Sequence, residues 1–213
     1  MKVLVAIPTL SRADLLIRNK EFLEAIKAPD EVLLLDNGDQ VIDIEVPIEH
    51  SENNLGVAGS WNFFLRRAFV ERDFDGLVLL QDDIIWDMKR LSYAKDLLMF
   101  RKDVDLFLAY HQFSIQVHRR ENVQTIGYYD ERYFPAYCED DDYAVTMTDL
   151  GRVYQRFHEL DPLPGSIIEG TPKPPGVEQS RKFVEKWGAK NFRVNALGPW
   201  YDTNRNILRK GRL

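Results

Sequence analysis

Cysteine is almost missing from this 213-residue sequence, in which Cys138 is the only one. A disulfide within the chain is therefore excluded, and such sparse cysteine usage is typical of a reducing compartment. Long apolar runs are missing as well: none reaches the roughly 18 residues that a transmembrane helix needs, and the first one, residues 3–7, is too short for the core of a signal peptide. We therefore expect a cytoplasmic protein with no transmembrane segment.

Positive charge is also in short supply, because 28 Lys and Arg stand against 34 Asp and Glu. The net charge of -6 argues against nucleic acid as a partner, since non-specific binding of phosphates needs a basic face. The basic cluster at residues 205–212 is interpreted as a solvated terminus, with contact to a membrane surface as the less favoured alternative. Apolar residues make up 45% of the chain, which predicts a folded globular protein.

The sequence alternates between two apolar patterns. Short apolar runs indicate strands, and apolar residues at helical spacing indicate helices between them. The predicted strands cover residues 3–7, 32–35, 46–49 and 77–80, and the predicted helices cover 56–72 and 11–26, the latter opened by a capping box at 11–14. This order predicts an α/β fold with a mostly parallel central sheet and helices on both faces, in which ligands bind beyond the carboxyl ends of the strands.

Asp82 and Asp83 follow the most apolar of these strands. Two adjacent carboxylates repel each other unless solvent or a cation screens them. Hard cations such as Mg²⁺ and Mn²⁺ prefer oxygen ligands and are commonly held by one or two carboxylates together with substrate phosphates. The residues alone leave two interpretations open, a divalent metal site and a solvated turn that caps the next helix.

A second acidic cluster occupies residues 139–142, and apolar side chains follow it at helical spacing as far as Phe157. Carboxylates at a helix start are stabilised by the free N–H groups there, so capping is one explanation. Four in a row exceed what capping needs, and the surplus suggests a general base or a ligand of substrate hydroxyls.

Two polar segments with glycine lie at predicted helix entries or strand exits, residues 36–38 and 53–59. Taken alone, each is an ordinary turn signal, with a base-recognising role for the carboxylate of Asp36 as the less favoured alternative. The segment at 53–59 is also compatible with phosphate binding at a helix N-terminus.

In order along the chain, seven short segments resemble motifs of the family 2 glycosyltransferases of the GT-A fold. They are VAIPTLSR at 5–12, LLDNG at 34–38, NLGVAGSWN at 54–62, LLQDD at 79–83, GYYDERYF at 127–134, CEDDD at 138–142 and FVEKWG at 183–188. The pair at 127–134 and 138–142 is the most specific, because it matches the family's Gly-Gly-Phe-Asp-Glu and Glu-Asp-x-Asp blocks even in their separation. The resemblance covers roughly residues 3–190, and it implies a GT-A fold.

The resemblance also implies roles for individual residues. Donor contacts are implied for Pro8, Thr9, Ser11, Arg12, Asp36, Asn37, Asn54, Gly56, Asn62, Gln81 and Asp82, and acceptor contacts for Tyr129, Asp130, Glu131 and Asp142. Asp140 takes the position of the family's catalytic base, with Glu139 beside it, and Asp83 takes that of the usual metal ligand. The metal is expected to be Mn²⁺ or Mg²⁺.

The sequence departs from the family pattern at two positions. Gln81 replaces the first aspartate of the Asp-x-Asp metal motif, so it brings no charge to the metal. Glu169 lies near the place where relatives often carry a metal-binding histidine, and it is either a substitute oxygen ligand or a surface strand residue.

The resulting hypothesis is an inverting, metal-dependent glycosyltransferase that moves a sugar from a nucleotide diphosphate sugar to an acceptor hydroxyl on a glycan, a lipid-linked molecule or a protein. One domain is expected over residues 1–213, with a donor-binding half at about 1–87, an acceptor and catalytic half at about 88–190 and a C-terminal extension at 191–213. The alternatives are a catalytically silent nucleotide-sugar-binding module and a sugar-phosphate nucleotidyltransferase. The latter typically has a glycine-rich loop after its first strand, and residues 8–12 contain no glycine.

Overall fold

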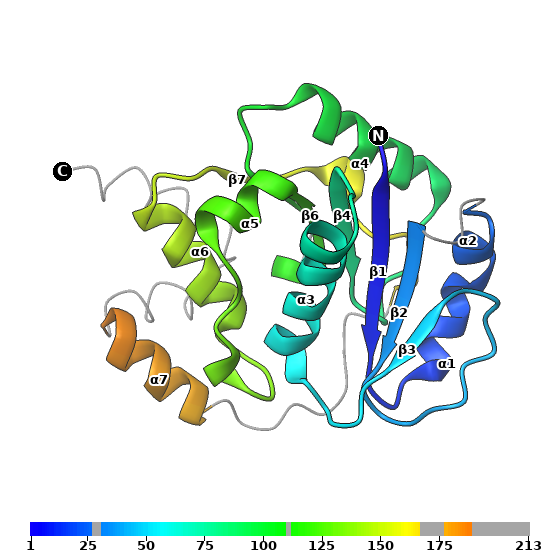
Figure 1. Ribbon diagram of the computed structural model, residues 1–213, viewed down its shortest axis with the longest axis horizontal. Helices are drawn as coiled ribbons and strands as arrows, with labels where there is room; N and C mark the ends of the chain where they lie inside the picture. The colour runs from blue at the N-terminus through cyan, green and yellow to red at the C-terminus, as the bar shows by residue number, and fades with distance from the viewer. Residues whose placement is uncertain (27–30, 110–111, 167–176, 189–213) are drawn as a thin grey trace.

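The structure is a computed structural model, and it describes residues 1–26, 31–109, 112–166 and 177–188 (Figure 1). Its centre is a seven-stranded sheet with the strand order β3-β2-β1-β4-β6-β5-β7. The strands are β1 (Val3–Thr9), β2 (Val32–Asp36), β3 (Ile48–His50), β4 (Gly76–Leu80), β5 (Leu106–Leu108), β6 (Ile115–Arg119) and β7 (Tyr154–Arg156). β1 pairs in parallel with β2 and β4, β2 with β3, and β5 with β7, whereas β6 runs antiparallel to both of its neighbours. The predicted mostly parallel α/β sheet is confirmed.

Helices cover both faces of the sheet. One face carries α1 (Ala13–Leu16), η1 (Ile17–Asn19), α2 (Lys20–Glu24) and α4 (Met88–Phe100), and the other carries α3 (Gly56–Arg66), the π-helical turn η3 (Arg67–Glu71), α5 (Arg120–Ile126) and α6 (Glu139–Asp149). The short 3-10 turns are η4 (Gln112–Ser114), η5 (Glu131–Tyr133) and η6 (His158–Leu160). The last described helix, α7 (Val177–Trp187), lies beside α6 (Figure 1).

The side-chain alternation along β1 explains the two layers. Val3, Val5 and Ile7 enter the core under α1, α2 and α4, whereas Leu4 and Ala6 enter the core under α3. All five are essentially inaccessible to solvent. A strand that is apolar on both faces is stable only between two layers of helices, which is why this run reads as continuously hydrophobic.

The predicted helix over residues 11–26 is broken into α1, η1 and α2, and the predicted capping box does not form. Ser11 has a φ of 57°, in the left-handed region, and Arg12 occupies the N-cap position without a side-chain cap. Because the chain is still turning away from β1 at Ser11, the helix begins at Ala13, beyond the reach of a cap from that serine. The capping-box prediction is therefore wrong.

The helix that begins with the acidic cluster is shorter than its apolar spacing predicts. α6 ends at Asp149, because Gly151 has a φ of 66° and the N–H groups of Gly151 and Arg152 bond back to Thr148 and Met147. Tyr154 instead lies on β7, where it pairs with Leu106 of β5. The predicted continuation of this helix to Phe157 is wrong, since a left-handed glycine ends it.

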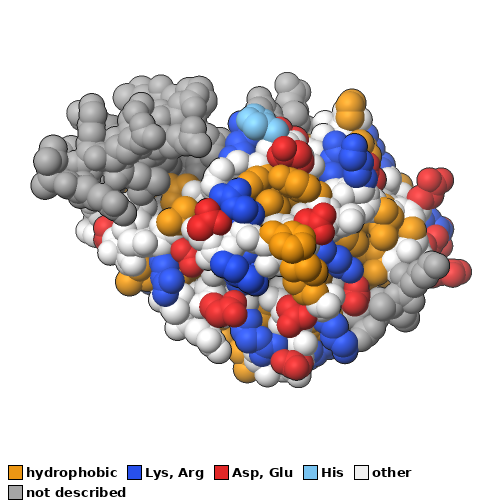
Figure 2. All heavy atoms as spheres, turned by 90° about the horizontal axis from the view of Figure 1, so that it is seen from above, with side chains coloured by type: hydrophobic (Ala, Val, Ile, Leu, Met, Phe, Trp, Pro, Cys, Tyr) orange, Lys and Arg blue, Asp and Glu red, His pale blue; other side chains and the backbone are white. Residues whose placement is uncertain are grey.

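Two other predicted elements have shifted or altered boundaries. The third strand is Ile48–His50, slightly later than the predicted 46–49, and the predicted helix over 56–72 changes from α-helix to π-helix at Arg67. Among the described helices, none has both the length and the apolar character needed to cross a membrane. On the face seen from above in Figure 2, acidic and basic side chains alternate around exposed apolar ones.

Candidate functional site

The carboxyl ends of β1, β2 and β3 lie next to one another at one edge of the sheet. Thr9 is in register with Asp36, and Asp36 is in register with His50. β4 is parallel to β1 on its other side, and residues 81–83 leave the sheet at the same edge. In Figure 1 this is the lower edge, to which the arrow of β1 points. The topology thus brings together side chains that lie more than 70 positions apart in the sequence.

Asp36 is fully buried at this edge, and both of its carboxylate oxygens accept hydrogen bonds. Oδ1 accepts from the N–H of Gly38 at 2.8 Å and from Nε2 of Gln40 at 2.9 Å, and Oδ2 accepts from the N–H of Gln40 at 2.7 Å. Nδ1 of His50 lies 3.1 Å from Oδ2. Burial alone would raise the pKa of Asp36, but the hydrogen bonds from Gln40, Gly38 and His50 outweigh it and lower the pKa.

Asp82 contacts the end of β1 directly. The hydroxyl of Thr9 donates a hydrogen bond to Oδ2 of Asp82 at 2.9 Å. Burial raises the pKa of Asp82 to about 6, the hydrogen bond from Thr9 opposes this rise, and the negative charge of Asp83 adds to it. A cation beside Asp82 and Asp83 would relieve the repulsion between the two carboxylates and offset their loss of hydration.

Other predicted donor residues lie at or just after the ends of β1 and β4. Arg12 is half-buried, pairs with Asp14 at 3.2 Å, and lowers the pKa of Asp82 through its positive charge. Pro8 is half-buried within β1, and Ser11 is exposed in the turn after it. Gln81 is half-buried, and its N–H bonds to the carbonyl of Ser114. The structure therefore brings the β1, β2 and β4 candidates into one region.

The polar segment before α3 is used to fix the start of that helix. Nδ2 of Asn37 donates to Ser60 at 2.8 Å, and Oδ1 of Asn54 accepts from the N–H of Gly56 at 2.8 Å. Gly56 has a φ of 68°, and a Cβ atom there would lie 2.7 Å from the carbonyl oxygen of Pro135. Only glycine satisfies both conditions. Donor contacts from Asn37, Asn54 and Gly56 stay a prediction.

Asn62 joins α3 to the segment that precedes α6. Its Nδ2 donates to the carbonyl of Tyr129 at 2.9 Å and to Oε1 of Glu131 at 2.8 Å, and its Oδ1 accepts from the N–H of Tyr129 at 2.8 Å. Asn62 is 1% exposed. A buried amide with all these partners holds the two segments together. The donor contact predicted for Asn62 would therefore require it to give up a hydrogen bond to Tyr129 or Glu131.

Tyr129, predicted as an acceptor contact, is buried in the core. Its ring stacks on Tyr143 with a centroid distance of 4.1 Å, and its hydroxyl donates to Oε1 of Gln116 at 2.6 Å. His118 completes this buried cluster, with Nε2 at 2.9 Å from the same oxygen. Glu131, in contrast, is exposed and lies 3.8 Å from Arg66. Of these two predicted acceptor contacts, Glu131 is therefore the one at the surface.

The start of α6 holds two carboxyl groups in different environments. Glu139 is 5% exposed and its Oε2 has no hydrogen-bond partner among the described residues, whereas Asp140 is half-buried and its Oδ1 accepts from the N–H of Asp141 at 2.9 Å. Burial, followed by the negative charge of Asp140, raises the pKa of Glu139 well above its usual value. The preceding residues Tyr137 and Cys138 both have a positive φ, 87° and 68°. Such backbone geometry is costly for non-glycine residues and is typical of functional sites.

Asp142, also predicted as an acceptor contact, holds α7 against α6. Its carboxylate accepts from Nε1 of Trp187 at 2.6 Å, from the hydroxyl of Tyr133 at 3.1 Å and from Nζ of Lys186, which lies 2.8 Å from Oδ1. Nζ of Lys186 also lies 3.1 Å from Asp130, whose pKa is lowered by Arg132 first and then by Lys186. We call Asp130, Asp142, Lys186 and Trp187 the α7 clamp. The acceptor roles of Asp130 and Asp142 stay predictions.

The described residues can supply part of a divalent metal site. No group of three or more His, Cys, Asp and Glu side chains that could hold a metal occurs in the ranges that the structure describes. Asp82 and Asp83 nevertheless offer adjacent carboxylates, and Mg²⁺ or Mn²⁺ is often bound by one or two carboxylates plus substrate phosphates. Glu169, the other predicted ligand, lies outside the described residues. The carboxylates of Asp82 and Asp83 therefore fit a metal whose further ligands include phosphates of the substrate.

Two residues of the carboxyl edge, Gln40 and His50, were missed by the sequence analysis, and Lys186 was matched only as part of the segment at 183–188, with no role of its own. His50 follows the third predicted strand directly, so its place at a carboxyl edge was available as a signal. Gln40 carries no such signal, and the motif at 183–188 does not predict the partners of Lys186, because these contacts depend on the course of the loop after β2 and on the docking of α7.

The fold is similar to solved structures of sugar transferases and of a CMP-linked synthetase. A mannosyltransferase from Pyrobaculum calidifontis, solved with GDP-mannose and Mn²⁺, superimposes with a TM-score of 0.58 at 13% identity, covering 99% of this chain and 79% of that one. A protein from Desulfovibrio desulfuricans classed as a nucleotide-diphospho-sugar transferase gives 0.54 at 8% identity, covering 98% and 97%. A CMP:2-keto-3-deoxy-manno-octonic acid synthetase solved with CTP gives 0.51 at 10% identity, covering 87% and 99%.

The sequence comparisons gave no match: no family model and no curated protein matches this chain. At such low identity the structural matches establish the fold alone. The chain thus has the GT-A-like fold of nucleotide-diphospho-sugar transferases, and its membership of family 2 stays a prediction.

Proposed function

We propose that this protein is an inverting glycosyltransferase that uses a nucleotide diphosphate sugar as donor. The observation that carries the proposal is the contact between Thr9 and Asp82 at the carboxyl edge, where the ends of β1, β2 and β4 meet. This edge is where open α/β sheets bind their ligands, and two adjacent carboxylates there are suited to a cation-bound diphosphate. The GT-A-like fold supports the same class of substrate.

The donor residues divide between the two ends of the nucleotide. Arg12 supplies positive charge beside Asp82, in the turn after β1, and we assign it to the diphosphate. Asp36 keeps the loop after β2 in place through its bonds to Gly38 and Gln40, so its contribution is to shape the nucleotide site. Gln81 has an amide that can bind a ribose hydroxyl.

Asp83 is the residue that we assign to the metal, with Asp82 beside it and Glu169 as the further candidate. When bound, Mn²⁺ or Mg²⁺ supplies charge stabilisation for the diphosphate leaving group. The protein's contribution is to hold adjacent carboxylates in a partly buried place, where burial raises the pKa of Asp82 because negative charge is poorly solvated there.

Asp140 is the proposed general base. It removes the proton from the acceptor hydroxyl, the acceptor oxygen forms a bond to the anomeric carbon, and the bond from that carbon to the diphosphate oxygen breaks, with inversion. Glu139 has its pKa raised by burial and by Asp140, so we assign it a neutral carboxyl that donates a hydrogen bond to a sugar or acceptor hydroxyl. Environments that push two neighbouring carboxyl pKa values apart commonly separate their roles in this way.

A sugar-phosphate nucleotidyltransferase is the second candidate, favoured by the structural similarity to the CMP:2-keto-3-deoxy-manno-octonic acid synthetase. The two activities release different products. A glycosyltransferase releases a nucleoside diphosphate from a nucleotide sugar, whereas a nucleotidyltransferase releases pyrophosphate from a nucleoside triphosphate and a sugar phosphate.

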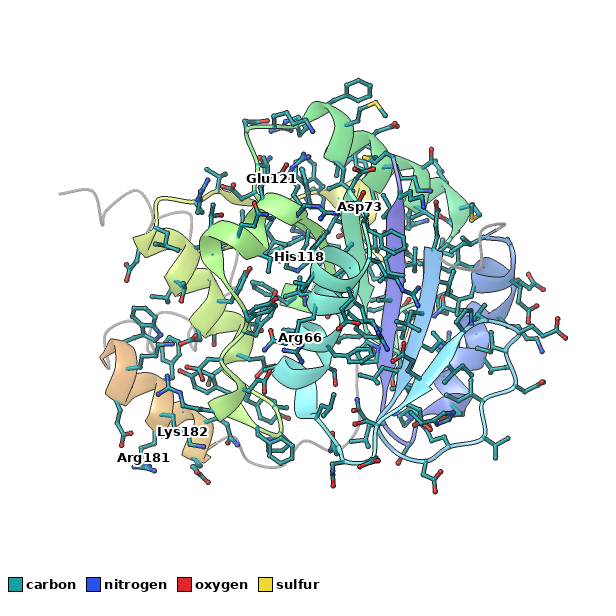
Figure 3. All side chains as sticks on the ribbon, viewed as in Figure 1. Arg66, Asp73, His118, Glu121, Arg181 and Lys182 are labelled. Carbon is teal, nitrogen blue, oxygen red and sulfur yellow. The ribbon has the colours of Figure 1, made fainter. Side chains whose placement is uncertain are left out.

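The proposal is tested by incubating the protein with Mn²⁺ and a panel of nucleotide sugars and measuring the released nucleoside diphosphate. Asp83→Asn should reduce release by roughly 10² or more, because it removes a carboxylate that would hold the metal beside the diphosphate leaving group. Asp73→Asn is the matched control, since that side chain is fully exposed and lies toward the opposite end of the strands (Figure 3). A parallel incubation with nucleoside triphosphates and sugar phosphates tests the second candidate, and pyrophosphate release there would favour the nucleotidyltransferase. Nucleotide binding without turnover in either incubation would favour a silent binding module.

A further inference from the structure

A pocket of about 310 Å³ lies beside the predicted donor residues, and none of them lines it. It is formed between the end of the edge strand β3 and the helix α3. Leu35, Leu55 and Phe63 make its apolar wall, and Glu49, His50 and Glu52 are among its polar residues. Its volume is at the lower end of the range for small-molecule sites and suits one heterocycle with part of its ribose.

His50 joins this pocket to the buried carboxylate of Asp36. Its Nδ1 lies 3.1 Å from Oδ2 of Asp36, while 60% of its side chain remains exposed. An ionised carboxylate can only accept hydrogen bonds, so a neutral His50 carries its proton on Nδ1. Its Nε2 is then left as an acceptor at the pocket, and Asp36 fixes the orientation of the ring.

The polar side of the pocket is rich in acceptors and negative charge. Glu49 is paired with Arg67, whose guanidinium also lies 5.4 Å above the ring of Phe63. Glu52 is exposed at the pocket and adds a second carboxylate. Carboxylates repel phosphate, so Glu52 disfavours the diphosphate of a nucleotide at this pocket. A planar ring that presents N–H groups to these acceptors, and its faces to the apolar wall, is favoured.

The position of the pocket also suits one end of a nucleotide. His50, Asp36 and Thr9 lie on successive strands, and Asp82 contacts Thr9 from the far side. Three strand spacings of about 4.8 Å give about 14 Å between the β3 and β4 ends of this row. This span is comparable with an extended nucleoside diphosphate, so a base in the pocket leaves the phosphates near Arg12 and Asp82.

We propose that this pocket binds the base of the donor nucleotide and that His50 and Glu52 select bases with an exocyclic amino group, namely guanine, adenine or cytosine, over uracil. The inference rests on the proposed function, because it assumes a nucleotide at this edge. Uracil presents carbonyl oxygens on both sides of its single N–H, and an oxygen facing Glu52 would be repelled.

Calorimetric titration of GDP, ADP, CDP and UDP in Mn²⁺ tests the inference. At least one amino-bearing nucleotide should bind wild-type protein tenfold or more tightly than UDP, since a hydrogen bond to a charged group has about that effect. Glu52→Gln should remove most of this preference, and His50→Ala should weaken the binding of the preferred nucleotide by tenfold or more. Glu21→Gln, an exposed change on α2, is the matched control and should change neither value.

The outcomes separate this inference from the proposed function. Tight binding of all four nucleotides without preference, or a preference that both pocket variants retain, would overturn the inference and leave the proposed function standing. Absence of binding by all four would overturn both. Melting temperatures of the variants show whether they fold. If His50→Ala does not fold, Glu52→Gln still decides the test, because Glu52 is exposed and its substitution leaves the core intact.

Discussion

Glu139 and Asp140 show how neighbouring residues of one type acquire different chemistry. They are adjacent in the sequence, yet Glu139 is buried with an unpartnered oxygen among the described residues, and Asp140 is half-buried. Because a general base must both be ionised and reach its substrate, exposure favours Asp140 for that role. The raised pKa of Glu139 results from its burial and from the negative charge of Asp140 rather than from the sequence motif.

We predict that Asp140→Asn lowers kcat by roughly 10² or more and leaves donor affinity unchanged, because it removes a proton acceptor. Glu139→Gln should cost less, since an amide still donates a hydrogen bond, as the neutral carboxyl does. Initial rates, donor affinity and melting temperatures of both variants provide the measurement. If Glu139→Gln abolishes turnover while Asp140→Asn retains it, the two assignments must be exchanged.

His118 is a buried titratable residue in the core cluster with Tyr129, where it lies inside the molecule (Figure 3). Its Nδ1 has no partner among the described residues, and burial lowers its pKa to about 3. The unfolded chain has a His pKa of about 6.5 and therefore binds a proton over a range in which the folded chain does not. The stability associated with neutral His118 is present above about pH 6.5 and is lost as the pH falls toward 3.

We predict that between pH 7 and pH 5 the wild-type protein loses about 1–2 kcal/mol more of its free energy of unfolding than His118→Gln does, following a limit of about 1.4 kcal/mol per pH unit. Glutamine preserves a donor for Gln116 but does not titrate. Urea denaturation at several pH values measures the difference. Asp82 and Glu139 have raised pKa values in the folded protein, so they stabilise it as the pH falls, opposite to His118. Both proteins contain these two residues, so the difference between the proteins isolates the effect of His118. Equal pH dependence of the two proteins would contradict the prediction.

At the scale of elements, α7 fixes the segment that contains the candidate base. Phe183 is completely buried against Tyr133 and Cys138, just before the start of α6. Gln179 bonds to the carbonyl of Phe134, and Lys182 bonds to that of Arg132. The α7 clamp adds the contacts of Asp142. The helix therefore supports, from outside the sheet, the strained turn that precedes Glu139.

We predict that Lys186→Met destabilises the protein by about 1–3 kcal/mol, because it leaves the buried carboxylate of Asp142 without its countercharge. Turnover should fall as well, since α7 positions the start of α6. Urea denaturation and initial rates measure the two effects.

Arg181→Met is the matched control on the same helix, where the side chain is 65% exposed and pairs only with Glu185 among the ion pairs of the described residues (Figure 3). A change below about 0.5 kcal/mol is expected there. If both substitutions have the same small effect, the α7 clamp has no energetic role.

At the scale of the whole molecule, α3 connects the carboxyl edge of the sheet, called the donor edge here because donor binding is proposed there, to the region before α6. Its first turn binds Asn37 through Ser60 on one side and the carbonyl of Pro135 through Val57 on the other. Asn62, further along the helix, holds Tyr129. Residues implied as donor contacts by the resemblance thus join the two parts of the site. Binding at the donor edge should accordingly stabilise the folded molecule as a whole.

We predict that Mn²⁺ and a nucleoside diphosphate together raise the Tm, whereas either one alone has little effect, because Asp82 and Asp83 need the phosphates to complete a metal site. At a ligand concentration of 100 Kd the stabilisation is about 2.7 kcal/mol, or roughly 5–10 °C for a chain of this size. Thermal denaturation with a chelator as control measures it. Full stabilisation by the nucleotide in chelator, or by nucleotide and Mn²⁺ in Asp83→Asn, would rule out the metal assignment.

Local pattern in the sequence determined the class of fold. The continuous apolar runs of β1, β2 and β4 predict buried parallel strands, because such runs are stable only between two layers of helices. The same runs end at Thr9, Asp36 and the Asp82–Asp83 pair, so the edge of the sheet that carries the candidate site was also predictable. Helix ends were harder to predict. They depend on the left-handed backbone conformations of Ser11 and Gly151, which the spacing of apolar residues does not reveal.

Only the tertiary structure decided what each polar residue contacts. The sequence places Asp36, Asn62, Tyr129 and Asp142 in motifs, but whether a side chain faces a ligand depends on the partners that distant segments bring to it. Asp36 is surrounded by hydrogen-bond donors from its own loop and from β3, and Asp142 is occupied by a helix some 45 positions away. The pocket beside His50 likewise exists only because β3 and α3 pack together. Contacts of this kind are long-range, and the energy of a buried polar group depends on them more than on its neighbours in the chain.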